Sequence, residues 1–423
     1  MGSNFNASQA GAYAPRLFFP AEDIRASKQW RDDPSPEQIA ALNAAYPTEA
    51  EYAALLDRKM SRRNRGPYEL PSLEEMSRCT RAFLKDQIGD DFTIADEGWL
   101  TGGASKIQFG FTLTWSDAGQ RRTEKLVVRM EPAESLNATS RRREFQIIEA
   151  MKGSIPVPPC YWMDPEGEWF PEPAIVYGFI SGVTAPSTSN ARISGTGTTF
   201  TPELRAKLGP QFVEHLAKIH SNDLAGADLS AFDMPEIGTT QSAEWQLNRV
   251  LRFWEEDRGE DFPIVEVAAN WLRDNLPELD IVSAQHGDYR TGNYLFDEDS
   301  GQINGWLDWE RSYLGDRHRD LAWVTTELFG NVAEDGKTFL VSGLVPLEQF
   351  YDDYQRLTGF EIDPKRLRYY RIFNSFSLVC SCLSTRYRVI RLGKSHQDVL
   401  LSLIEGAAYP IADEMLRYLE EDV

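Results

Sequence analysis

The stretch HGDYRTGN at residues 286–293 carries polar side chains in the order that phosphoryl transfer requires. Asp288 can orient and deprotonate an attacking hydroxyl, and Asn293, five positions later, can bind a magnesium ion. Asp308 follows fifteen residues after Asn293 and offers a second hard oxygen ligand. This order and spacing are typical of a kinase catalytic loop and its downstream metal ligand. The stretch therefore predicts ATP- and Mg²⁺-dependent phosphorylation of a hydroxyl group.

Most of these positions also have a structural interpretation. Asp288 could cap a turn, although its spacing to the two metal ligands favours a catalytic base. Arg290 could neutralise charge on the transferred phosphoryl group or form a surface salt bridge. We expect His286 to brace the loop, and Glu310 to assist metal binding or only to cap. Asp320, like Asp316, is expected to cap a helix and to pair with a nearby arginine.

The composition is that of an ordinary globular protein, with 423 residues, 42% hydrophobic and 26% charged. The 44 Lys and Arg against 65 Asp and Glu give a net charge of -21. This balance argues against nucleic acid or an anionic membrane as the main partner. The four cysteines are expected to be reduced, and no secretory signal or membrane-spanning run is apparent, so a cytoplasmic protein is expected.

Hydrophobic periodicity predicts a small α+β lobe at residues 91–183. Alternating residues at 107–115 and 124–130 predict adjacent antiparallel strands. Residues 141–151 have helical periodicity, and residues 174–180 read as one more buried strand. Residues 1–90 read as a polar helical extension, and residues 184–423 as a mostly helical lobe that carries the polar loop.

A glycine-containing turn is the first candidate for nucleotide binding. Residues 100–106, with the sequence LTGGASK, could fold over the ATP phosphates. Glycine lets backbone N–H groups approach an anion, and Gly103, Ala104 and Ser105 are the candidate contacts. The pattern is short, and many hairpins contain two glycines.

The second candidate is a strand cation against the α- and β-phosphates. Arg129 occupies the position of the usual lysine, with Glu144 on the following helix as its expected partner. Lys125 has the same strand parity and is the alternative. The backbone from Gly178 to Ile180 precedes the inter-lobe loop and is the expected hinge contact for adenine.

Three motifs together resemble the aminoglycoside-phosphotransferase and choline-kinase-like family. They are HGDYRTGN, then INGWLDWE at 303–310 and GDRHRDLAW at 315–323, and the resemblance extends over about residues 90–330. Within the family, the chain is similar to the branch related to kinase domains fused to acyl-CoA dehydrogenases. The resemblance implies a protein-kinase-like two-lobe fold, ATP, Mg²⁺ and a small hydroxylated acceptor, hydroxyacyl-CoA-like or aminoglycoside-like.

The resemblance also implies that the helical tail lines the acceptor pocket, with the candidates Phe373, Phe376, Arg386, Tyr387 and Arg388. An acidic acceptor face would favour a cationic amine, and a basic groove would favour a CoA thioester. Arg129 in place of lysine, together with the amino-terminal extension, leaves a pseudokinase or nucleotide-gated binding module as the alternative. The choice between ATP and GTP, the role of residues 1–90 and the oligomeric state stay open.

Overall fold

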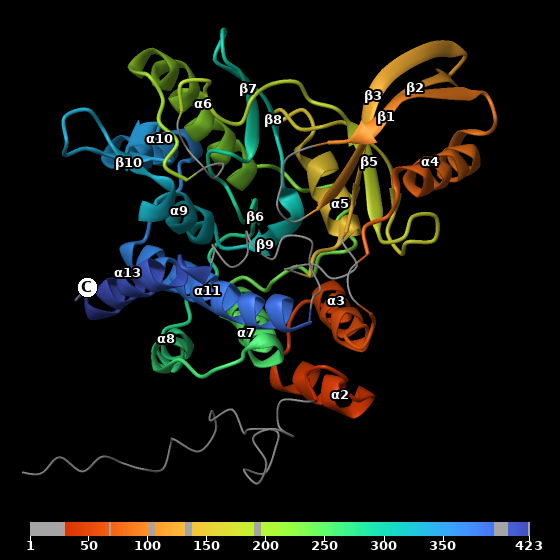
Figure 1. Ribbon diagram of the computed structural model, residues 1–423. Helices are drawn as coiled ribbons and strands as arrows, with labels where there is room; N and C mark the ends of the chain where they lie inside the picture. The colour runs from red at the N-terminus through yellow and green to blue at the C-terminus, as the bar shows by residue number, and fades with distance from the viewer. Residues whose placement is uncertain are drawn as a thin grey trace, which may run out of the picture.

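The computed structural model describes residues 30–66, 69–100, 106–131, 138–189, 196–392 and 405–421, with the backbone alone at 385–387 and 389–392. Over these residues the chain forms a small lobe built on an antiparallel sheet and a larger lobe built mostly of helices (Figure 1). The α+β class predicted from the sequence is confirmed. Within the described ranges, no helix is both long and apolar enough to cross a membrane.

The sheet of the small lobe has five strands in the described residues, in the order β1-β2-β3-β5-β4, and all neighbouring strands are antiparallel. The predicted strands and helix correspond to β2, β3, β5 and α5. The elements of this lobe are α4 (Leu73–Ile88), β1 (Phe92–Trp99), β2 (Ile107–Asp117), β3 (Gln120–Met130), α5 (Arg141–Met151), β4 (Cys160–Asp164) and β5 (Ala174–Gly178).

The sequence did not predict β1 or β4. The alternation of β1 is interrupted at residues 95–98, where its pairing register with β2 shifts and Asp96 has a positive φ of 52°. Such a bulge breaks the period of two on which strand prediction rests. Strand β4 directly follows the proline-rich residues 156–159, and four of its five side chains are only partly buried.

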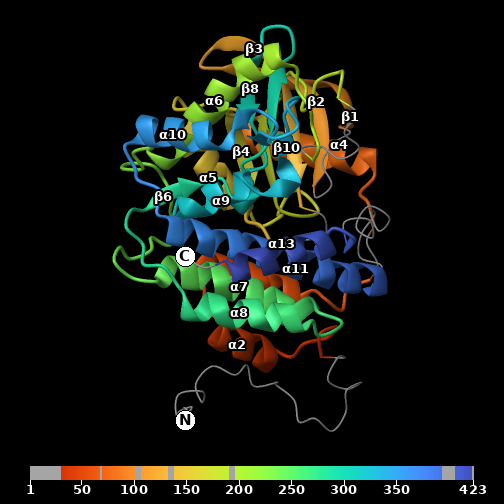
Figure 2. The same ribbon diagram turned by 90° about the vertical axis from the view of Figure 1, so that its left-hand side faces the viewer.

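The helical lobe is organised around α11, which packs against α7, α8, α9 and α13. Figure 2 shows α13, α11, α7 and α8 stacked from top to bottom in the lower half of the molecule. Its helices are α6 (Pro202–His220), α7 (Gln241–Asp257), α8 (Pro263–Asp274), α9 (His318–Val324), α10 (Leu347–Thr358), α11 (Pro364–Leu392) and α13 (Ala408–Glu420), with the short helices η1 (Trp309–Arg311) and η2 (Glu327–Phe329).

Short strands place the polar loop on this helical base. β6 (Ser283–Gln285) pairs with β9 (Tyr313–Gly315), and β7 (Tyr294–Asp297) pairs with β8 (Gln302–Trp306). A separate small sheet contains β10 (Asn331–Val332), β11 (Phe339–Val341) and β12 (Val345–Pro346).

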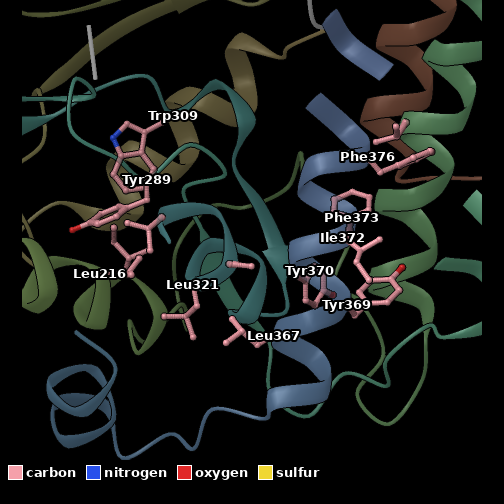
Figure 3. Close-up of a cluster of buried hydrophobic side chains, with 14 of the residues drawn as sticks. Leu216, Tyr289, Trp309, Leu321, Leu367, Tyr369, Tyr370, Ile372, Phe373 and Phe376 are labelled. Carbon is pink, nitrogen blue, oxygen red and sulfur yellow. The ribbon is translucent and has the colours of Figure 1, made fainter. Parts of the chain in front are cut away.

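One hydrophobic core runs from the polar loop to α11 (Figure 3). The ring of Tyr289, inside the HGDYRTGN loop, stacks on Trp306 with centroids 4.0 Å apart, and its hydroxyl donates to the backbone carbonyl of Phe212. Tyr289 and Trp306 are fully buried. The loop that carries the candidate chemistry is therefore fixed by aromatic packing and is not a loose surface turn.

The amino-terminal helices contact both lobes. α2 (Pro36–Ala45) and α3 (Ala50–Ser61) lie beside α7, where Lys59 forms an ion pair of 2.8 Å with Asp257 and Arg63 donates to the carbonyl of Glu256 at 2.8 Å. α4 instead packs its apolar side on the small sheet, in a core that Met76 and Phe83 share with β2 and β3. The predicted domain boundaries at 90 and 183 stay predictions.

We expect Phe83→Ala to lower the free energy of unfolding by about 3–5 kcal/mol, because it leaves a cavity between α4 and the sheet. Phe83 is fully buried, and its ring lies 5.3 Å from that of Phe170. Urea denaturation measures the change. Leu73→Ala is the matched control, since Leu73 is on the same helix but 41% exposed, and its effect should stay within about 0.5 kcal/mol. Equal losses in the two variants would contradict this account of α4.

Candidate active site

A buried carboxylate holds the start of the HGDYRTGN loop. The side chain of Asp320, on α9, accepts hydrogen bonds from the backbone N–H of His286 at 2.7 Å and of Gly287 at 2.9 Å. Asp320 is fully buried. Burial by itself would raise its pKa, but hydrogen bonds and charge from His220 and His286 lower the pKa below the ordinary value. Asp320 is structural, but the helix cap and the arginine partner predicted for it are wrong, because its carboxylate binds two loop amides and lies 3.5 Å from His220.

Two neighbouring expectations can be checked by geometry. His286 braces the loop, since its Nε2 lies 3.0 Å from the carbonyl oxygen of Leu307. Asp316 caps α9 by accepting from the N–H of His318 at 3.0 Å, and its other oxygen lies 3.3 Å from Nε of Arg366. The capping and arginine pairing predicted for Asp316 are confirmed.

Asp288, the candidate base, lies in an almost closed polar environment. The indole N–H of Trp323 donates to its carboxylate at 2.8 Å, and Nε of Arg290 lies 3.0 Å from the same oxygen. Burial would raise the pKa of Asp288, but the charges of Arg290 and Arg311 outweigh burial and hold the pKa below its ordinary value. Asp288 is therefore an ionised carboxylate, oriented by a tryptophan and an arginine, and Arg290 pairs with Asp288 itself.

Asn293 and Asp308 are brought together by the hairpin of β7 and β8. Asn293 directly precedes β7, and Leu307 directly follows β8. The backbone N–H of Leu307 donates to the carbonyl of Asn293 at 2.8 Å, so these two ends of the hairpin lie side by side. The amide nitrogen of Asn293 donates to the carbonyl of Asp288 at 2.7 Å, which leaves its amide oxygen for another partner. Asp308 follows the end of β8, as predicted, with a left-handed φ of 65°.

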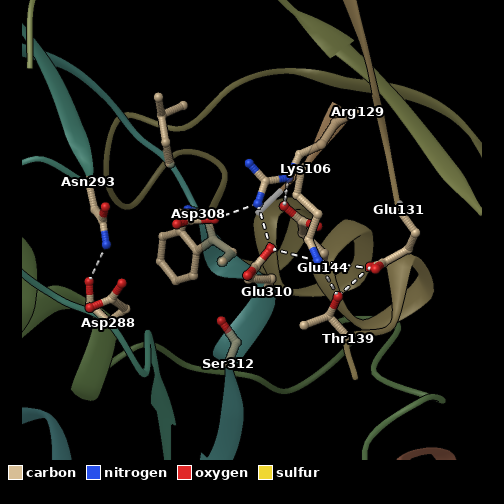
Figure 4. Close-up of polar contacts among 12 residues, drawn as sticks. Lys106, Arg129, Glu131, Thr139, Glu144, Asp288, Asn293, Asp308, Glu310 and Ser312 are labelled. Carbon is tan, nitrogen blue, oxygen red and sulfur yellow. Dashed lines mark hydrogen bonds and ion pairs between the residues drawn. The ribbon is translucent and has the colours of Figure 1, made fainter. Parts of the chain in front are cut away.

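Arg129, on β3, connects the two lobes. Its Nε lies 3.1 Å from Glu144 on α5, so the predicted pairing is confirmed. Its terminal nitrogen contacts Asp308 and lies 2.7 Å from Glu310 (Figure 4). The alternative cation, Lys125, is exposed and lies over the ring of Phe179, with Nζ 4.1 Å from the centroid. Arg129 is thus the strand cation that faces the candidate metal ligands.

Glu310 has a larger part than the sequence indicated. Its side chain is only 6% exposed and contacts Arg129, while Nζ of Lys106 lies 3.3 Å away and Arg141 lies 3.8 Å away. Burial would raise the pKa of Glu310, but the charges of Lys106, Arg129 and Arg141 together lower it below the ordinary value. Lys106 also donates to Thr139 at 2.9 Å. Glu310 and its three cations, at positions 106, 129 and 141, are far apart in the sequence, and only the fold brings them together.

The remaining predicted nucleotide contacts are placed only in part. Gly103, Ala104 and Ser105 lie outside the described residues. The N–H groups of Gly178 and Phe179 donate to the carbonyls of Pro159 and Lys125, at 2.8 and 2.9 Å. Among the hinge amides that the structure describes, the N–H of Ile180 is the one without a backbone partner.

The predicted acceptor side chains have different positions in the structure. Phe373 lines a small cavity, and Phe376 is fully buried in the core. Arg388 is buried and forms an ion pair of 3.0 Å with Asp257, so it holds α11 to α7. The side chains of Arg386 and Tyr387 lie outside the described residues.

A model of the phosphotransferase enzyme family matches residues 111–370. The chain belongs to this family. The match covers β2 to α11 and includes Asp288, Asn293 and Asp308. The prediction of a phosphotransferase is therefore confirmed, and it rests on a match that spans both lobes.

Curated relatives include an acyl-CoA dehydrogenase of Arabidopsis thaliana, 24% identical over 271 residues, a match covering 60% of this chain and 32% of the relative. Acyl-CoA dehydrogenase family member 11 of Gallus gallus is 29% identical over 175 residues, covering 39% of this chain and 22% of the relative. The chain thus spans about a third or less of the length of these two relatives.

A crystal structure of a Ralstonia eutropha protein, assigned by name to the aminoglycoside phosphotransferases, superimposes with a TM-score of 0.59. The two sequences are 20% identical, and the superposition covers 81% of this chain and 97% of the other. This likeness confirms the protein-kinase-like two-lobe fold.

We expect Asp320→Ala to lower the free energy of unfolding of this phosphotransferase by about 3 kcal/mol, because two buried N–H groups, of His286 and Gly287, lose their acceptor. Chemical denaturation measures the loss. Asp320→Asn keeps one acceptor oxygen and should be intermediate. Asp299→Ala, at an exposed site, is the control for loss of an acidic residue. An unchanged free energy for Asp320→Ala would rule out this anchoring role.

Proposed function

We propose that the chain is an ATP- and Mg²⁺-dependent kinase that transfers the γ-phosphoryl group to a hydroxyl of a small molecule. The observation that carries the proposal is the arrangement around Asp288, an ionised and oriented carboxylate beside Asn293 (Figure 4). Asp308, in the same lobe, contacts Arg129 across the lobe junction. These are the groups on which phosphoryl transfer by kinases depends.

In the proposed mechanism, Asp288 accepts the proton of the acceptor hydroxyl. The hydroxyl oxygen forms a bond to the γ-phosphorus, and the bond from that phosphorus to the bridging oxygen breaks, so that ADP leaves with the electron pair. Trp323 and Arg290 hold the carboxylate of Asp288 in one orientation by their contacts of 2.8 and 3.0 Å. Arg129 is the proposed contact for the phosphates, together with Gly103, Ala104 and Ser105. The N–H of Ile180 is the proposed contact for adenine.

The donor set fits magnesium. Asn293 offers an amide oxygen and Asp308 a carboxylate, and both are hard oxygen ligands. No group of three or more His, Cys, Asp or Glu side chains that could hold a metal occurs in the described part of the chain. A pair of protein oxygens suits Mg²⁺, which commonly completes its shell with waters and substrate phosphates. When bound, the ion would offset negative charge on the phosphates.

Small hydroxylated molecules are the proposed acceptors. The net charge of -21 argues against nucleic acid, as it does against an anionic membrane. The cytoplasm stays the compartment expected from the sequence. A pseudokinase is the competing possibility, and turnover separates it from the kinase.

The first experiment measures transfer of label from γ-labelled ATP with Mg²⁺ to hydroxyacyl-CoAs, aminoglycosides, macrolides and amino alcohols. We expect Asp288→Ala to lower kcat by about 10²–10⁴-fold, the usual contribution of a general base. Binding of a non-hydrolysable ATP analogue should be retained. Asp297→Ala, an exposed position on the neighbouring hairpin, is the control. Full activity of Asp288→Ala would refute the proposed base, and nucleotide binding without label on any acceptor would favour the pseudokinase.

The kcat of the kinase should be insensitive to pH near 6.5, with MgATP saturating. The pKa of Asp288 lies below its ordinary value of 3.8, so the carboxylate is ionised above that pH and is lost as a base only when the pH falls through the lowered pKa. Burial also lowers the pKa of His286 below its ordinary value of 6.5. Steady-state rates over roughly pH 5.5–8 test this, because a histidine base with its ordinary pKa of 6.5 would give an acid limb in that range.

A further inference from the structure

A second polar site lies next to Asp288. A cavity of about 40 Å³ is enclosed by α3, α7, α11 and the segment that follows Asp308. Three arginines from separate parts of the chain line it: Arg249 on α7, Arg311 after the candidate metal ligand, and Arg319 on α9. Apolar and aromatic side chains complete the walls, among them Leu56, Val250, Phe253 and Phe373.

These three arginines lack the carboxylate partners that buried arginines elsewhere in this protein have. Within the described ranges, none of them forms an ion pair within 4.0 Å, whereas Arg129 and Arg252 each contact two or more carboxylates. Arg249 and Arg319 donate to the one amide oxygen of Gln246, at 3.1 and 3.2 Å.

The other contacts of these guanidinium groups are mostly aromatic. Arg249 lies 3.4 Å from the ring centroid of Tyr52, and Arg311 lies 4.5 Å from that of Trp323. Arg319 is only 4% exposed, lies 4.8 Å from the ring of Tyr313, and its Nε has no hydrogen-bond partner. Such contacts stabilise a cation but do not neutralise it.

Like charges in one buried site are unfavourable unless an anion accompanies them. The pKa of Arg311 lies below its ordinary value, because burial and the charges of Arg319 and Arg249 together outweigh the opposing charge of Asp288. Glu310 also lines the cavity, but its carboxylate contacts Arg129, with Lys106 near by. Asp288 offsets part of the positive charge of Arg311, and the remaining positive charge of the cavity is left for a ligand.

One tryptophan contacts both an arginine of the cavity and the candidate base. The ring of Trp323 lies against Arg311, and the indole N–H of the same residue donates to Asp288. A group bound by Arg311 would thus lie one side chain from the proposed base. Part of the wall comes from the amino-terminal extension, through Tyr52 and Lys59 of α3.

We propose that this cavity binds an oxyanion, a carboxylate or phosphate, of the acceptor molecule, with α3 as a specificity element. The volume has room for about three water molecules, which suits one such group while the rest of the acceptor extends toward Asp288. Guanidinium groups bind carboxylate and phosphate in two-pronged geometry. The inference rests on the proposed kinase function, and within it favours anionic acceptors over cationic aminoglycosides.

The first test compares acceptors that differ only in charge, such as hydroxy acids and their neutral amides, by steady-state kinetics. We expect Arg249→Gln to raise KM for the anionic acceptor by about 10–100-fold, the effect of losing one charge-assisted hydrogen bond. The KM for ATP and for the neutral acceptor should change little. Arg356→Gln, at an exposed site on α10, controls for the change in net charge. Equal KM values for the charged and neutral acceptors in the parent protein would overturn the proposal.

The second test does not need turnover. Inorganic phosphate is titrated into the full chain with a non-hydrolysable ATP analogue and Mg²⁺ present, and the melting temperature is recorded. Phosphate should stabilise the parent protein and Arg356→Gln but not Arg249→Gln. A phosphate-dependent rise in melting temperature that persists in Arg249→Gln would place the anion elsewhere and overturn the proposal.

The two tests separate the failure of the site from the failure of the kinase. An arginine-dependent phosphate shift without label on any acceptor would support the oxyanion site and count against the kinase. Label on neutral acceptors, with no arginine-dependent shift, would support the kinase and overturn the site.

Discussion

The ion cluster around Arg129 is the interaction on which the arrangement of the site depends. One guanidinium on the small sheet contacts Glu144 on α5 and both Asp308 and Glu310 in the helical lobe. A buried charge is tolerated only when it is paired, and removing one partner of such a group is costly. The orientation of the two lobes and the position of Asp308 are therefore fixed by the same residue. Arginine suits this position because its planar group can contact three carboxylates, which the single ammonium of lysine does less well.

The helical lobe holds the other half of the site by different means. Tyr289 anchors the HGDYRTGN loop in an aromatic core, and Asp320 binds the two amides at its start. Asn293 is held through its amide nitrogen, so its amide oxygen is not used in holding it. One oxygen of Asp288 contacts Trp323 and Arg290. Such a division leaves polar atoms available for ligands while the backbone stays fixed.

Local spacing explains what the sequence could predict. Asp288, Asn293 and Asp308 lie within one short segment, and a strand cation with a helix glutamate is a recognisable pair, so Arg129 and Glu144 could be named. Strands β2, β3 and β5 and helix α5 follow from clear periodicity. The contacts of Glu310 join residues from 106, 129 and 141, and no pattern along the chain records such a meeting. The same is true of the three arginines, which are separated by up to seventy positions.

The amino-terminal segment gains its meaning from those distant contacts. Residues 50–61 form an amphipathic helix with basic residues at its carboxyl end. In the fold, Lys59 forms an ion pair with Asp257, and Tyr52 stacks on Arg249. The first contact fastens α3 to the helical lobe, and the second holds the guanidinium at the cavity. A helix that is fixed by ion pairs on one turn can position an aromatic ring two turns away, because an α-helix is rigid over that length. The extension is therefore built as a wall of the cavity beside Asp288, and the kinase fold that follows it supplies the other walls.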